Sequence, residues 1–79
     1  IILYPDFTIR HPKTGEYFYW EHFGLMDDPV YCKNTFSKLQ LYTTNNIVPD
    51  INLITTYETR ERPLSMEKIE RIITEYFIE

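Results

Sequence analysis

The sequence has little cysteine and no long apolar run. Its one cysteine, Cys32, excludes an internal disulfide and cannot by itself build a zinc cluster. No apolar run approaches the ~18 residues that a membrane span needs, and no secretory signal peptide is visible. These features predict a cytoplasmic protein that does not enter a membrane.

Positive charge is also scarce. Eight lysines and arginines face twelve aspartates and glutamates, which gives a formal net charge of −4. This balance counts against an attraction to nucleic acid over the whole surface, although a local basic patch or bound metal ions would still bind phosphate. The excess of carboxylates has a second interpretation, which is that some of them gather to bind cations.

The chain is well supplied with apolar residues for its length. Its 79 residues are 43% hydrophobic and 16% aromatic, which argues against disorder and predicts one small domain over residues 1–79 with a thin core. It opens on Ile1-Ile2-Leu3-Tyr4 without an initiator methionine. We therefore expect it to be part of a longer protein.

Residue patterns predict five elements in the order strand-strand-helix-strand-helix. The turn His11-Pro12-Lys13-Thr14-Gly15 joins the first two strands into a hairpin. Asp28 and Pro29 are typical of a helix start, and Asn45-Asn46 is typical of its end. The predicted elements are a strand over residues 1–10, a strand over 16–23, a helix over 29–44, a strand over 51–58 and a helix that begins after Ser65.

This order predicts an α/β fold, a small mixed sheet with flanking helices. The first helix is long enough for a right-handed crossover, which would make the second and third strands parallel. Within it, Tyr31, Phe36, Leu39 and Tyr42 fall roughly along one apolar stripe. The edge strands of such a sheet are exposed. We expect another part of a longer chain, or a second copy of this chain in a homodimer, to cover them.

Two acidic residues stand out, Asp6 on the first strand and Glu21 on the second. Pairing Arg10 with Glu16 or Tyr17 places Asp6 opposite residue 20 or 21, and cross-strand neighbours lie ~4.5–5.5 Å apart. Two carboxylates at that separation can share Mg²⁺ or Mn²⁺. Spacing alone favours a simpler interpretation, in which both carboxylates face solvent or form salt bridges.

Longer residue strings around Asp6 and Glu21 favour the metal site over the simpler interpretation. The strings are Pro5-Asp6-Phe7-Thr8-Ile9, then Tyr19-Trp20-Glu21-His22-Phe23-Gly24, then Asp27-Asp28-Pro29. Together they resemble the PD-(D/E)XK nuclease superfamily, and more narrowly the bacterial nuclease-like domains found alone or at the C-terminus of DNA helicases. The resemblance covers residues 4–58, and it implies a restriction-endonuclease-like core that lacks the first helix and strand.

The resemblance implies a Mg²⁺- or Mn²⁺-dependent endonuclease that hydrolyses phosphodiester bonds in DNA. Asp6 and Glu21 would bind the metal. Such enzymes carry a lysine two residues after the glutamate, where this chain has Phe23, but some supply the lysine from the following helix. Lys38 is then the candidate catalytic lysine, with Lys33 behind it; the alternative for Lys38 is a solvated helix residue.

Two further residues have open roles. His22 is either a general base or metal ligand, or a hydrogen-bonded packing residue beside Trp20. Glu58, at the end of the third strand, either joins Glu21 at one edge of the sheet or pairs with a nearby arginine, Arg60 or Arg62.

A different function stays open beside the nuclease. The phenylalanine at position 23, the acidic charge and the truncated core all favour an inactive module with the nuclease fold. Such a module would serve nucleic-acid binding or protein interaction.

Overall fold

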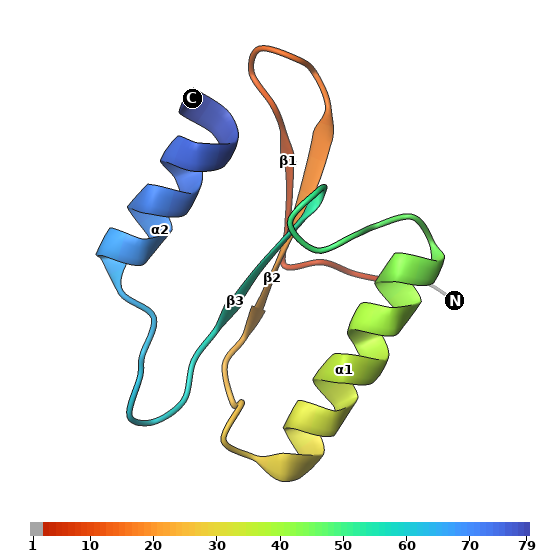
Figure 1. The fold of residues 1–79 in the computed structure, drawn as a ribbon, viewed down its shortest axis with the longest axis vertical. Coiled ribbons are helices and arrows are strands. Elements are labelled where there is room, and N and C mark those ends of the chain that lie inside the picture. The colour runs from red at the N-terminus through yellow and green to blue at the C-terminus, as the bar shows by residue number, and fades with distance from the viewer. Residues whose placement is uncertain (1–2) are drawn as a thin grey trace.

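The computed structural model of the protein describes residues 3–79. Two helices flank a mixed sheet of three strands in the order β1-β2-β3, which confirms the predicted fold class. Figure 1 shows α1 on one side of the sheet and α2 on the other. The elements are β1 (Phe7–Arg10), β2 (Tyr17–Phe23), α1 (Pro29–Thr44), β3 (Leu53–Tyr57), α2 (Met66–Ile73) and a π-helical turn, η1 (Thr74–Ile78).

The strand pairing follows the prediction. β1 and β2 form an antiparallel hairpin in which Arg10 lies opposite Tyr17. β2 and β3 are parallel, with Glu21 opposite Thr55, because α1 carries the chain across the sheet between them. The central strand therefore presents alternate residues to α1 and to α2.

The two faces of the sheet have different interiors. On the α2 face, Trp20, Ile54 and Phe77 form the buried core. Phe18 packs edge-to-face on Phe77 with ring centroids 5.3 Å apart. The α1 face buries an ionisable residue, Glu21. A buried charge at this position requires an ionic or hydrogen-bonding partner on the α1 face.

Helix α1 begins where the sequence predicts. The Asp28 carboxylate accepts hydrogen bonds from the backbone N–H groups of Val30 and Tyr31 at 2.9 and 3.0 Å. Just beyond the other end of the helix, Asn46 adopts a left-handed conformation with φ 64°. The predicted apolar stripe is wrong for Phe36, which is 62% exposed. Phe36 lies five positions after Tyr31, which corresponds to a rotation of about 140° around the helix axis. This rotation turns Phe36 away from the sheet.

The first strand is shorter than predicted. Ile1 and Ile2 lie outside the described residues, and β1 begins only at Phe7. Before Phe7, a side chain replaces the backbone in the hydrogen bonding between the two strands. The backbone N–H of His22 donates to Asp6 Oδ2 at 2.8 Å. Pro5 has no N–H to extend the ladder. Within residues 3–79, no helix has the length and apolar character needed to cross a membrane.

Candidate functional site

A cavity of about 220 Å³ lies between α1 and the sheet, and it contains the predicted site. Asp6 comes from the approach to β1, Glu21 from β2 and Lys38 from α1. The fold thus brings together three charged residues that are separated by 15 and 17 positions in the sequence. The full lining is Asp6, Glu21, His22, Phe23, Tyr31, Asn34, Thr35 and Lys38.

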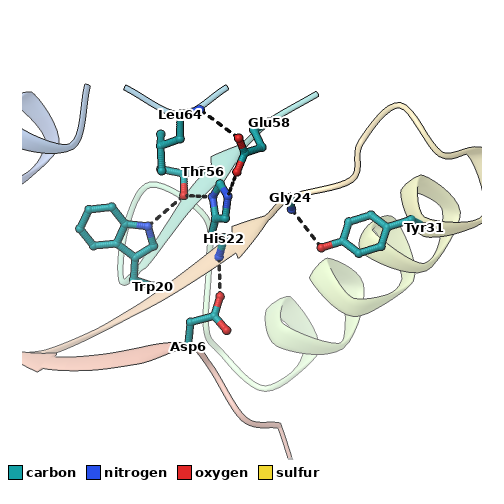
Figure 2. Close-up of polar contacts among 8 residues, drawn as sticks. All are labelled: Asp6, Trp20, His22, Gly24, Tyr31, Thr56, Glu58 and Leu64. Atoms are coloured by element: carbon teal, nitrogen blue, oxygen red, sulfur yellow. Dashed lines mark hydrogen bonds and ion pairs between the residues drawn. The ribbon is translucent and has the colours of Figure 1, made fainter. Parts of the chain in front are cut away.

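Asp6 lies at the open side of this cavity. Its residue is exposed, and its Oδ2 accepts the hydrogen bond from the backbone of His22 (Figure 2). A backbone N–H is fixed by the strand, so it holds the carboxylate in one orientation. His22 directly follows Glu21, and Asp6 and Glu21 line the same cavity.

Glu21 is the buried member of the pair, with only 3% of its surface exposed. Its Oε2 forms an ion pair with the Lys38 ammonium, whose side chain is 38% exposed. Apart from this ion pair, no residue between 3 and 79 forms a hydrogen bond with Oε2. Glu21 is therefore a buried carboxylate with a single cationic partner.

Tyr42 is a neighbour of Glu21 and was not predicted as a site residue. It is fully buried. Its hydroxyl has no hydrogen-bond partner of good geometry in the described part of the chain. Burial raises the pKa of this phenol most, and the negative charge of Glu21, within hydrogen-bonding reach, raises the pKa further. The sequence signal was its position four residues after Lys38, which places both on one face of α1.

The ring of His22 lies on the other face of the sheet. Its Nδ1 is 2.9 Å from Thr56 Oγ1 and its Nε2 is 2.8 Å from Glu58 Oε1. Trp20 Nε1 also donates to Thr56 Oγ1, at 3.1 Å (Figure 2). Both ring nitrogens are thus engaged away from Asp6 and Glu21, and His22 contributes its backbone N–H to the cavity.

Glu58 is the acidic partner of His22. Its Oε2 also accepts a hydrogen bond from the backbone N–H of Leu64, at 3.2 Å. The hydrogen bond from His22, and then that from Leu64, lower the pKa of Glu58. Both sequence interpretations of Glu58 are therefore wrong. The parallel register places His22 opposite Thr56, and Glu58, two residues after Thr56, reaches the His22 ring.

The donors at the cavity fit a hard divalent cation. Between residues 3 and 79 no three histidine, cysteine, aspartate or glutamate side chains form a metal-holding group. Mg²⁺, however, keeps several water ligands and is commonly bound through one or two carboxylates. Asp6 offers an exposed carboxylate, and Glu21 offers a buried oxygen whose partner is a displaceable ammonium. Lys33 is exposed and does not line the cavity.

Comparison of the chain with protein-family models, curated proteins and solved structures gave no match. The resemblance to the PD-(D/E)XK superfamily thus stays a prediction from the residue pattern.

Proposed function

We propose that this domain is a metal-dependent, endonuclease-like module that hydrolyses phosphodiester bonds in DNA. The observation that supports the proposal is the shared cavity of Asp6, Glu21 and Lys38. Two carboxylates are suitable ligands for a metal ion that catalyses this hydrolysis, and a lysine beside them is the residue that the resemblance to the nuclease superfamily implies. They come from three separate elements, so their proximity depends on the fold as a whole.

Each side chain has a distinct part in the proposal. Asp6 and Glu21 supply oxygen ligands to Mg²⁺ or Mn²⁺, and the backbone N–H of His22 fixes the Asp6 carboxylate. When bound, the ion polarises the phosphodiester and lowers the pKa of a water molecule. Lys38 neutralises Glu21 before the cation and substrate arrive. Because its side chain is partly exposed, its ammonium can then donate to a phosphate oxygen.

A second function is favoured by the same ion pair. Lys38 already satisfies the charge of Glu21, and Phe23 occupies the position that carries the lysine in the resembling family. A module with this arrangement would bind nucleic acid or another protein without cutting. The two proposals differ in one measurable property, which is cleavage that depends on a divalent cation.

Plasmid cleavage in Mg²⁺ or Mn²⁺ tests the first proposal. We expect Asp6→Asn and Glu21→Gln to lower the cleavage rate by at least about 100-fold, because metal-ion catalysis is worth several kcal/mol. Glu16→Gln is the matched control, since Glu16 is an exposed carboxylate outside the cavity. Full activity in Asp6→Asn would refute the nuclease site. Absence of cleavage with retained DNA binding would support the inactive module.

A further inference from the structure

The hydroxyl of Tyr42 is a polar group that the proposed chemistry does not yet use. We infer that Tyr42 is a positioning residue, whose buried hydroxyl orients the Glu21 carboxylate toward a bound Mg²⁺ or Mn²⁺. This inference rests on the proposed function, because it assigns a role to the residue behind the proposed metal ligand. It concerns binding of the cation and not the chemical step.

The placement of Tyr42 follows from the geometry of α1. Asn34, Thr35 and Lys38 line the cavity, and Tyr42 follows Lys38 by one helical turn on the same face. Lys38 pairs with Glu21, and Tyr42, one turn later, has its hydroxyl within hydrogen-bonding reach of the same carboxylate. Tyr42 is fully buried, and its hydroxyl is therefore shielded from water.

A buried hydroxyl without a well-formed hydrogen bond is costly to keep. Leaving such a group unsatisfied destabilises the folded state, and phenylalanine would fill nearly the same volume without that penalty. Here the carboxylate of Glu21 lies within hydrogen-bonding reach of the hydroxyl. The hydroxyl is thus a neutral donor beside a carboxylate that otherwise depends on Lys38 alone.

The two neighbours of Glu21 differ in their exposure to solvent. The side chain of Lys38 is 38% exposed and can move toward solvent when a cation approaches Glu21. The Tyr42 ring is enclosed and stays in place. Once the ammonium leaves, the hydroxyl becomes the donor that holds the carboxylate in a single orientation. Fixed donors of this kind behind a metal ligand typically change metal affinity by ~10–100-fold.

Mn²⁺ binding to the whole chain, measured by electron paramagnetic resonance, tests the inference. We expect Tyr42→Phe to weaken Mn²⁺ affinity by about tenfold while the melting temperature without metal stays equal or rises. Tyr76→Phe is the matched control, because it removes a half-buried phenol hydroxyl from η1, the element that follows α2 and packs on the face away from the cavity. It should leave Mn²⁺ affinity unchanged.

The possible outcomes distinguish failure of the proposed role of Tyr42 from failure of the proposed metal site. Equal Mn²⁺ affinity in Tyr42→Phe and the unmodified protein would overturn the role of Tyr42 and leave the metal site standing. No Mn²⁺ binding by the unmodified protein would refute the metal site and the inference together. If Tyr42→Phe fails to fold, Mg²⁺ titration of the unmodified protein by NMR decides: the Tyr42 ring signals should shift, and unchanged signals beside shifted Glu21 signals would overturn the inference.

Discussion

Replacing Lys38 by methionine tests the electrostatics of the cavity directly. The substitution keeps much of the length of the side chain and removes its charge. Glu21 would then remain 3% exposed without its cationic partner. A buried carboxylate that loses its counter-charge destabilises the folded state, because the unfolded chain can hydrate that carboxylate fully.

The size of the effect follows from the unequal burial of the pair. Breaking a fully buried ion pair costs ~3–5 kcal/mol, and an exposed pair contributes less than ~1 kcal/mol. The Lys38 side chain is 38% exposed and that of Glu21 only 4%, so we expect a loss between these limits, about 1–3 kcal/mol. For a domain of this size, that loss lowers the melting temperature by roughly 4–24 °C.

Thermal unfolding of four proteins provides the assay: the unmodified chain, Lys38→Met, Glu21→Gln and the double variant. The double variant should be more stable than the sum of the single losses predicts, because it has neither charge. Millimolar Mn²⁺ should stabilise Lys38→Met more than the unmodified chain, since the cation replaces the missing ammonium. Lys33→Met is the control on the same helix. Additive losses in the double variant would refute the ion pair as a coupled, buried interaction.

Two further predictions concern the network on the opposite face of the sheet. The pKa of Glu58 is lowered from its ordinary 4.5 by its bonds to His22 and Leu64, so its stabilisation is present above pH 4.5 and is lost as the pH falls through the lowered value. The difference in melting temperature between the unmodified chain and Glu58→Gln should therefore be present near pH 7 and decrease as the pH falls below 4.5. Thr56→Val leaves the Trp20 indole N–H without its acceptor and should cost ~1–3 kcal/mol in urea unfolding. Unchanged stability in Thr56→Val would show that this buried bond contributes little.

Features set by local sequence rules could be predicted well. Asp28 caps α1 because a short carboxylate reaches N–H groups two and three residues ahead, and that reach is visible in the sequence. The hairpin register was narrowed to two choices by its five-residue turn, and one of them pairs Arg10 with Tyr17 as observed. Both depend on residues close together in the chain.

Features that depend on distant contacts could not be predicted in the same way. Glu58 bonds to His22, 36 residues earlier, only because β3 pairs in one parallel register with β2. Tyr42 appeared as an ordinary apolar position, since the helical pattern shows which side of α1 is buried but not that Glu21 lies opposite. Helical spacing predicted that the last helix continues through Tyr76 and Phe77, but no local pattern indicated the π-helical form of Thr74–Ile78.

The packing of Phe23 explains why the lysine beside Glu21 comes from α1 and not from β2. Phe23 is 4% exposed and stacks on Tyr57 of β3, with ring centroids 5.5 Å apart. A lysine there would replace the buried member of an aromatic pair at the end of the sheet. Lys38 brings an ammonium to Glu21 from α1, across the cavity, and leaves the strand position to packing. A missing lysine at position 23 is therefore no argument against a cation beside Glu21, because the helix supplies one from a site that remains accessible to solvent.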